Sequence, residues 1–294
     1  MSDQPKTAFR DWRDYSPAEL DDQYNQNSLV TDSSPFRERK VRESEKVRAQ
    51  MDCTLDVAYG PSLAEKLDIF PAKVKGAPIQ IFIHGGAWKG GRKEDVSYPA
   101  PVFHDVGANY VAVNFALVPD VMIEEQIRQC RAAIAWVYRN AGSFDGDASR
   151  LYVSGHSSGG HVTGMMVTTD WEGIYGLPAD IIKGAAPGSG MYDVEPVRHT
   201  WRNDYLRLDE ARAHALSTIH HIPAVQIPLV IGYGTGELPE FQRQSVVFAD
   251  AWRTAGQVCE LIAVEGRHHF EMGADFGDLN SPVTQAILRQ MNLA

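Results

Sequence analysis

From residue 54 onward, short apolar runs alternate with stretches in which apolar residues recur at every third or fourth position. The central runs resemble strands that are buried on both faces of a sheet. The spacing of Ile123, Ile127, Cys130, Ile134 and Val137 is typical of a helix with one apolar face. We therefore predict a final helix over 284–291 and strands over residues 54–59, 66–71, 79–83, 110–113, 151–154, 181–185, 229–233 and 259–264.

The order of these elements constrains the fold. Gly60 and Pro61 form a turn between the first two predicted strands, whereas helical stretches separate most of the later strands. Repeated strand–helix–strand units favour parallel pairing with helices on the faces. The sequence predicts an α/β fold with a mostly parallel eight-stranded sheet and helices on both faces. Ligands bind outside the carboxyl ends of such strands, so chemistry is expected directly after them.

Residues 1–50 differ from the rest because they are polar and charged. Within 36–50, six basic residues are mixed with three acidic ones, and Glu38 and Arg42 are four positions apart, as on a solvated helix. A nucleic-acid patch is the alternative. We predict that 1–50 is a helical extension packed on the core and that 51–294 is a single domain.

Charge and hydropathy limit the classes of partner. The net charge of −10 argues against nucleic acid and anionic membranes as partners. No apolar run approaches the roughly 18 residues of a membrane span, and residues 1–12 lack the features of a signal peptide. Cys53, Cys130 and Cys259 have no metal-type spacing, which suggests reduced thiols. We expect a cytoplasmic protein; a homodimer is left open.

The strand predicted at 151–154 is followed by Gly155-His156-Ser157-Ser158-Gly159-Gly160. A G-x-S-x-G pattern between a strand and a helix is typical of a tight turn that presents the serine hydroxyl at its tip. Glycine is needed there because neighbouring side chains would clash. We predict that Ser157 is a nucleophile; a serine- and glycine-rich turn without chemistry is the alternative.

The strand predicted at 79–83 is followed by His84-Gly85-Gly86-Ala87-Trp88. A glycine-rich loop at this place supplies backbone N–H groups that bind an oxyanion, together with the N–H after the nucleophile. We assign Gly85, Gly86 and the amide of Ser158 to this role. We expect His84 to support the loop by hydrogen bonding rather than to transfer a proton.

A serine nucleophile needs a base and an orienting carboxylate. The last predicted strand is followed by His268 and His269, and both are candidates for the base. Glu237 is the first carboxylate after the preceding strand, and Asp193 is the alternative acid after an earlier one. The order serine, acid, histidine along the chain is that of the α/β-hydrolase fold.

Together these residues resemble the kynurenine formamidase (arylformamidase) group of α/β hydrolases, from about Tyr15 to the end of the chain. The resemblance is carried by residues 19–24, 84–88, 191–196, 206–211, 239–245 and 269–271. It implies that the acid is Glu237, where several members have Asp, and that the base is His269. Ala87 departs from the family, which usually has tyrosine at this position.

The resemblance implies a serine hydrolase that cleaves a small aryl amide or ester through an acyl-enzyme and needs no metal or organic cofactor. We expect a small-molecule, aromatic substrate that contacts Trp88, Ala87, Tyr192 and Trp201, and a small cap over about 190–222. The alternatives are a general carboxylesterase, an acyltransferase of the same fold and a non-catalytic ligand-binding member.

Overall fold

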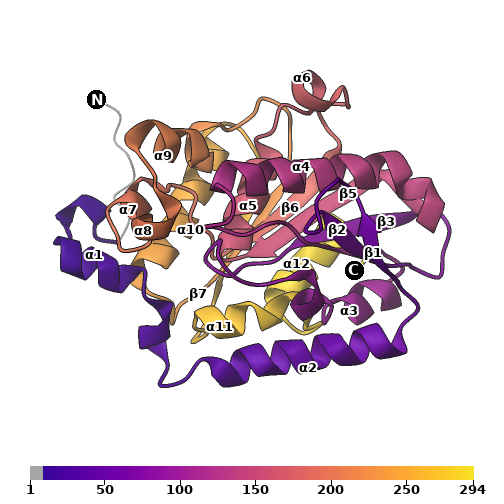
Figure 1. Cartoon of the computed structure of the whole chain (residues 1–294), viewed down its shortest axis with the longest axis horizontal. Helices are drawn as coiled ribbons and strands as arrows, with labels where there is room; N and C mark the ends of the chain where they lie inside the picture. The colour runs from indigo at the N-terminus through magenta and orange to yellow at the C-terminus, as the bar shows by residue number, and fades with distance from the viewer. Residues whose placement is uncertain (1–8) are drawn as a thin grey trace.

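The computed structural model describes residues 9–294, and Figure 1 shows a central sheet between two layers of helices. Residues 1–8, which belong to the predicted extension and to the stretch without signal-peptide features, lie outside the described residues. The strands are β1 Thr54–Ala58, β2 Lys66–Phe70, β3 Ala77–Ile83, β4 Asn109–Val113, β5 Gly146–His156, β6 Ile182–Gly188, β7 Leu229–Gly234 and β8 Cys259–Val264.

The sheet has the order β1-β2-β4-β3-β5-β6-β7-β8, with β2 antiparallel to both of its neighbours and the remaining pairs parallel. This confirms the predicted mostly parallel eight-stranded sheet. The largest difference is β5, which extends beyond the predicted 151–154 at both ends. Its first five residues are exposed or partly exposed and include no large apolar side chain, so the apolar signal covered only its buried part.

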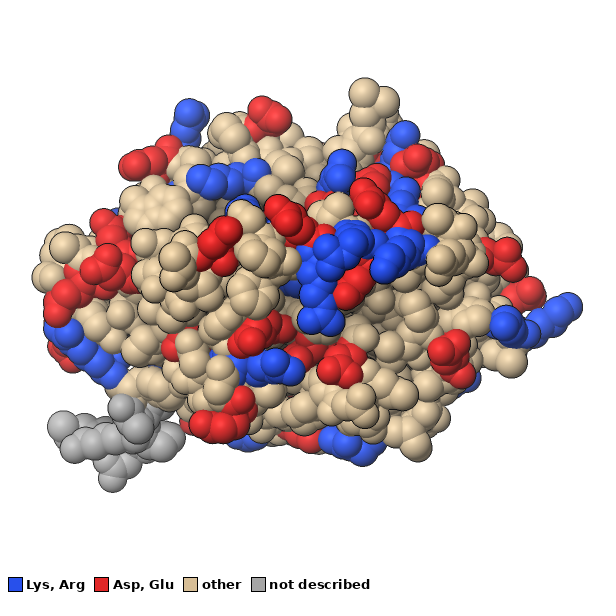
Figure 2. All heavy atoms as spheres, turned by 90° about the horizontal axis from the view of Figure 1, so that it is seen from below, with Lys and Arg blue, Asp and Glu red and all other residues tan. Residues whose placement is uncertain are grey.

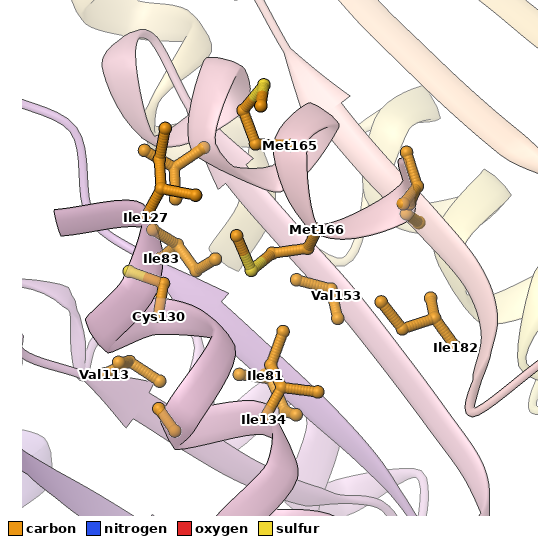
Figure 3. Close-up of a cluster of buried hydrophobic side chains, with 14 of the residues drawn as sticks. Ile81, Ile83, Val113, Ile127, Cys130, Ile134, Val153, Met165, Met166 and Ile182 are labelled. Carbon is orange, nitrogen blue, oxygen red and sulfur yellow. The ribbon is translucent and has the colours of Figure 1, made fainter. Parts of the chain in front are cut away.

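One face of the sheet is covered by the helices α4 Ile123–Asn140, α5 Ser158–Val167 and α10 Pro239–Thr254. Ile81 and Ile83 of β3 point to this face, where Ile127 and Ile134 of α4 contact them in a fully buried cluster (Figure 3). Side chains alternate between the two faces of a strand. Phe82, between the two isoleucines, accordingly belongs to the cluster on the opposite face.

The opposite face is covered by α3 Ala100–Asp105, α11 His269–Met272 and α12 Pro282–Gln290, with α2 Ser34–Gln50 outside them (Figure 1). Val283 and Ile287 of α12 are fully buried there, as expected for the predicted C-terminal helix. The short helix α6 Trp171–Tyr175 lies beyond α5 and contributes the buried Trp171 to the first face. None of the helices within residues 9–294 is long and apolar enough to cross a membrane.

The segment predicted as a cap consists of short helices between β6 and β7. They are α7 Glu195–Arg198, α8 Asn203–Leu206, α9 Glu210–Leu216 and the 3-10 turn η5 Thr218–His220. A buried histidine ties this segment to the core: His161 of α5 contacts the carbonyl oxygen of Leu216 through Nε2 at 2.8 Å. The cap is thereby held against the beginning of α5, next to the candidate nucleophile.

The N-terminal region begins with η1 Trp12–Asp14, α1 Pro17–Gln23 and η2 Gln26–Leu29, and continues into α2. Figure 2 looks onto the molecule from the side where α2 lies and shows Lys and Arg interspersed with Asp and Glu. On α2, Arg39 and Glu43, which are four positions apart, form an ion pair at 2.8 Å. The sequence had suggested Glu38 and Arg42 for such a pair. The hydroxyl of buried Tyr24, directly after α1, donates to Glu240 Oε1 of α10 at 3.1 Å.

A buried charge network attaches α2 to the sheet. Asp68 of β2 is fully buried and pairs with Arg48 of α2 and, at 3.0 Å, with Nζ of Lys93 in the 3-10 turn η3 Lys93–Val96. Lys93 is also buried, and its other partners are Asp56 at 2.9 Å and Glu94 at 2.6 Å. Ser44 of α2 reinforces the attachment because its hydroxyl accepts from the amide of Tyr98 at 3.0 Å.

Replacement of Asp68 by alanine is expected to destabilise the protein by about 3–5 kcal/mol, because Lys93 then loses its fully buried partner and keeps only two more exposed ones. The free energy of unfolding, obtained from urea denaturation, would measure the change. Glu43→Ala removes only an exposed partner of Arg39 and should cost less than about 0.5 kcal/mol. Similar losses in the two variants would contradict a structural role for the buried network.

Candidate active site

Ser157 lies in a strained turn between β5 and α5, with φ 62° and ψ −127°. Non-glycine residues rarely adopt positive φ, and such strain persists only where the surroundings enforce it. Here the backbones are so close that a Cβ at Gly159 would lie 2.2 Å from the carbonyl oxygen of Ile83. This close approach explains the glycines of the motif. It also explains why glycines occupy the first turn of α5, which begins at Ser158, although glycine is a poor helix former.

Two further side chains form a hydrogen-bonded chain with Ser157. The Oγ atom of Ser157 lies 2.9 Å from Nε2 of His269, and Nδ1 of the same ring lies 2.8 Å from Oε2 of Glu237. His269 begins α11 after β8, and Glu237 follows β7, so both are presented at the carboxyl ends of parallel strands. His269 and Glu237 are buried, whereas Ser157 is half-buried.

The second oxygen of Glu237 is held by two donors. Its Oε1 accepts from the hydroxyl of Ser189 at 2.6 Å and from the amide of Gly234 at 2.9 Å. These bonds leave Oε2 for His269 and restrain the carboxylate, as expected for a group that orients an imidazole. The alternative acid, Asp193, accepts instead from the amide of Glu195 at 3.0 Å, and its Oδ1 lies 3.4 Å from the hydroxyl of Ser217.

The neighbouring histidine, His268, points elsewhere. Its ring packs edge-on against Phe36 of α2, with 4.9 Å between the ring centroids. Its Nε2 atom lies 3.6 Å from Glu271 of the short helix α11, which begins one residue after His268. His268 therefore lies between α2 and α11, and the structure brings His269 alone of the two candidates to Ser157.

The loop after β3 approaches Ser157 from the other side. A Cβ at Gly85 would lie 2.4 Å from the carbonyl oxygen of His156, and Gly86 has φ 137°, which is compatible only with glycine. Within residues 9–294, the amides of Gly86 and Ser158 have no protein acceptor at hydrogen-bond distance. They are thus free to bind a substrate oxygen, and the amide of Ser158 lies at the positive end of α5.

The hydroxyl of Ser158 has a role that sequence reasoning missed, because only its amide was considered. Its Oγ accepts from the amide of Trp88 at 3.1 Å and so connects the elbow to the glycine loop. Gln126 of α4 holds the same residue from the other side by donating to the carbonyl oxygen of Trp88 at 2.6 Å. The loop is therefore fixed before any substrate binds. No pattern in one sequence indicates such a contact between distant segments.

Three buried histidines surround this centre, and burial keeps them neutral at pH 7. Burial lowers the pKa of His84 to about 4; its ring stacks on Phe115, and its Nδ1 is 3.2 Å from the carbonyl oxygen of Gly85. The pKa of His161 is also lowered to about 4 by burial. Burial lowers the pKa of His156 well below its usual range, and its ring packs 4.6 Å from that of His269.

Ser157 and His269 open into a cleft of about 670 Å³, a size typical of small-molecule sites. Of the predicted substrate-binding residues, Ala87 and Trp201 line this cleft. Trp88 and Tyr192 do not, which corrects the prediction for both. The Trp88 indole is buried and donates to Nδ1 of His161 at 3.1 Å, and Tyr192 is fully buried against Phe248.

The N-terminal extension supplies a wall of the cleft that the sequence analysis did not anticipate. Residues of η2 and of the first turns of α2 line it, including Arg37 and Lys40. Lys40 is half-buried, and burial lowers its pKa to about 8. The only signal in the sequence is the run of basic residues from 37 to 48, which was interpreted as a solvated helix. Within the described residues, no group of three or more His, Cys, Asp or Glu could hold a metal ion.

Comparisons with known proteins agree with this architecture. A family model described as BD-FAE matches residues 67–177. The kynurenine formamidase of Danio rerio is 27% identical over 96% of this chain and 98% of its own length. The kynurenine formamidase of Salmo salar is 28% identical over 95% of this chain and 98% of its own length. Esterase LipQ of Mycobacterium tuberculosis is 25% identical over 75% of this chain and 58% of its own.

Solved structures share the fold. A protein from Silicibacter sp. superposes with a TM-score of 0.79 at 24% identity, covering 92% of this chain and 98% of its own. Esterase B from Lactobacillus rhamnosis superposes with a TM-score of 0.70 at 15% identity, covering 92% of this chain and 96% of its own. The sheet order and the full-length similarity to formamidases lead to one conclusion. This chain has the α/β-hydrolase fold, is similar to kynurenine formamidases over nearly its full length, and is an enzyme that acts on amide or ester bonds.

Proposed function

We propose that the enzyme cleaves small aryl amides or esters, N-formyl-arylamines among them, by a Ser157–His269–Glu237 triad. The observation that carries this proposal is the chain of contacts from Ser157 Oγ to His269 Nε2 at 2.9 Å and from His269 Nδ1 to Glu237 Oε2 at 2.8 Å. The hydroxyl donates to Nε2, and the Nδ1–H donates to the carboxylate. This arrangement is the one that activates a serine for attack on a carbonyl.

In the first half of the reaction, Ser157 Oγ attacks the carbonyl carbon while its proton moves to Nε2 of His269. The negative charge that develops on the carbonyl oxygen is bound by the amides of Gly86 and Ser158, with Gly85 shaping the loop. Each such donor is worth about 3 kcal/mol in the transition state. The imidazolium of His269, stabilised by Glu237, then protonates the leaving amine or alcohol, and an acyl-enzyme remains.

In the second half, water donates a proton to His269 and attacks the acyl carbon. Collapse of the intermediate returns the proton to Ser157 Oγ and releases the acid. The same geometry would serve an alcohol or amine acceptor, which would make the enzyme an acyltransferase. An acyl group transferred to water or to another nucleophile leaves different products, so product analysis separates the two.

An aromatic substrate is supported by the lining of the cleft and by the relatives. The aromatic residues Trp201 and Phe270 are partly exposed and line the cleft together with Ser157, and the buried residues Tyr24, Phe82 and Tyr98 complete the lining. Trp201 is 38% exposed and therefore offers a ring surface to a ligand. Flat apolar rings favour stacking with a planar substrate.

A substrate panel tests the proposal. It would contain N-formylkynurenine, formanilide, aryl acetates and aryl acetamides, with liquid chromatography to identify the products with and without added methanol or hydroxylamine. We expect hydrolysis of at least one aryl amide or ester, and we expect a fluorophosphonate to abolish it. A well-folded protein that hydrolyses none of them would favour a non-catalytic binding role.

Replacement of Ala87 by tyrosine is expected to lower kcat/KM for bulky aryl acyl esters more than for formyl or acetyl esters. Ala87 lines the cleft next to Gly86, so a larger side chain there would fill space near the acyl group. Its φ of 53° is strained for any non-glycine residue, and alanine already adopts it. Steady-state kinetics with acyl groups of increasing size would measure the effect. An equal loss for small and large acyl groups would show that position 87 does not limit acyl size.

A further inference from the structure

Arg202 stands out among the buried cations. Three cationic side chains are buried among residues 9–294, namely Lys93, Arg202 and Arg243. Lys93 pairs with Asp68 at 3.0 Å, and Arg243 pairs with Glu240 at 2.6 Å. Arg202 is only 5% exposed, and no carboxylate of residues 9–294 lies within 4.0 Å of its guanidinium. A buried charge is costly without a counterion, and a guanidinium does not escape the cost by losing its proton.

The neighbours of Arg202 satisfy it only in part. Its Nη2 donates to the carbonyl oxygen of Tyr24 at 2.6 Å, and Nη1 contacts the sulfur of Met191 at 3.8 Å. The guanidinium lies 5.6 Å from the ring centroid of Tyr24 and 5.5 Å from that of Trp201. Its Nε is buried without a partner within residues 9–294. A donor therefore remains unused on a charge that has no counterion.

Arg202 lines the same cleft as Ser157 and His269, and the other charged residues there are mostly basic. Arg37, Lys40, Lys89 and Arg92 line the cleft, against one carboxylate, Asp95, which Arg92 already binds at 2.9 Å. The chain as a whole carries a net charge of −10. The cleft thus has the opposite sign to the protein, which favours an anionic ligand.

We propose that Arg202 is a specificity-determining residue that binds an anionic group, of the carboxylate class, on the substrate of Ser157. The inference rests on the proposed serine-hydrolase function and adds the charge of the substrate to it. A carboxylate bound in the cleft beside the guanidinium would supply the missing counterion. Lys40 and Lys89 contribute to the potential that attracts it.

The test compares substrates that differ only in charge. One pair is 4-acetoxybenzoate and 4-acetoxybenzamide, with the charge on the leaving group, and the other is monophenyl adipate and its terminal carboxamide, with the charge on the acyl chain. We expect the wild-type kcat/KM to be about 10- to 100-fold higher for the carboxylate in at least one pair, from the usual strength of a charge-assisted hydrogen bond. Parity in both pairs would overturn the inference.

Arg202→Met should remove this preference mainly through KM, while kcat/KM for the neutral carboxamide changes by less than about threefold. Arg202→Lys should keep part of the preference because it keeps the charge but not the planar fork. A loss of the same size on both members of the preferred pair would mean that Arg202 only supports the fold. Circular dichroism and thermal unfolding identify a variant that fails to fold. In that case the inference is tested by the ratio of the wild-type kcat/KM values for the carboxylate and the carboxamide of each pair.

Arg131 of α4 is the matched control. It is half-buried and donates from Nε to the hydroxyl of Thr169 at 2.9 Å, and, like Arg202, it has no carboxylate within 4.0 Å among the described residues. It does not line the cleft, so Arg131→Met should leave the charge preference unchanged. A change as large as that in Arg202→Met would show that the preference comes from overall charge, not from the cleft.

Binding of a product analogue separates this inference from the proposed function. Calorimetry would compare 4-hydroxybenzoate with 4-hydroxybenzamide on wild-type protein, Arg202→Met and Ser157→Ala. If no Ser157-dependent hydrolysis is found, the proposed function fails, yet tighter binding of the carboxylate that is lost only in Arg202→Met would still support the anion site. Equal binding of the two ligands by wild-type protein would contradict it.

Discussion

Replacement of Ser157 by alanine is expected to lower kcat/KM for any hydrolysed aryl ester or amide by about 10⁴-fold or more, with no loss of stability. In the proposed mechanism this hydroxyl forms the acyl-enzyme, and the strained turn between β5 and α5 places it 2.9 Å from Nε2 of His269. Stability should be retained or improved because alanine removes only one hydroxyl from a half-buried position. Steady-state kinetics would measure the loss of activity. The intact mass after treatment with a fluorophosphonate would show whether the protein still reacts at a nucleophile.

The neighbouring serine is the control for this experiment. Ser158→Ala keeps the amide that would bind the oxyanion and removes only the hydroxyl that holds the amide of Trp88 at 3.1 Å. We expect a much smaller loss of activity and unchanged labelling by the fluorophosphonate. A stoichiometric adduct on Ser157→Ala would move the nucleophile to another residue.

Replacement of His269 by alanine is expected to lower activity by several orders of magnitude, as removal of a catalytic base does. The imidazole joins Ser157 to Glu237, so its loss removes the proposed proton acceptor and leaves the Glu237 carboxylate without its partner. Labelling of Ser157 by the fluorophosphonate should slow in parallel, because that reaction needs the same base. The rate of labelling therefore measures the effect independently of the substrate.

His268→Ala is the matched control because it removes the same side chain one residue away. Its ring packs on Phe36 of α2 and lies near Glu271 rather than near Ser157. We expect a modest effect on activity and a measurable decrease in thermal stability as α2 loses a contact. If His268→Ala were the more damaging of the two, the base would be His268.

The candidate triad residues were predicted from two different sources, a local sequence pattern for Ser157 and positions after strands for Glu237 and His269. Ser157 and the glycines around it were predicted from a local pattern, because a sharp strand-to-helix turn needs those residues within six consecutive positions. Glu237 and His269 were chosen from their places after strands and from a family resemblance, and the structure brings both to Ser157. Whether these residues catalyse the reaction is what the two substitutions above measure.

The aromatic residues were harder to place. Trp88 and Tyr192 were expected to contact substrate, but both are buried, and Trp88 instead joins the glycine loop to His161. Trp201 lies in the turn between α7 and α8 and is partly exposed in the cleft. The sequence positions of these rings are alike, in loops after strands. Their orientation depends on which neighbour is available to pack against, and that neighbour is distant in the chain.

The sequence by itself determined the sheet, the elbow and the order of the candidate triad, because hydrophobic periodicity and tight-turn chemistry are local properties of consecutive residues. Only the tertiary structure decided that η2 and α2 close one side of the cleft and that Arg202 is buried beside it without a counterion. Residues 36–50 carry the mixed basic and acidic side chains of a solvated helix. This pattern does not distinguish a helix that faces water from one that lines a cleft. The difference arises from long-range contacts, such as those of Tyr24 with Glu240 and of Arg48 with Asp68, which set the position of the N-terminal region on the core.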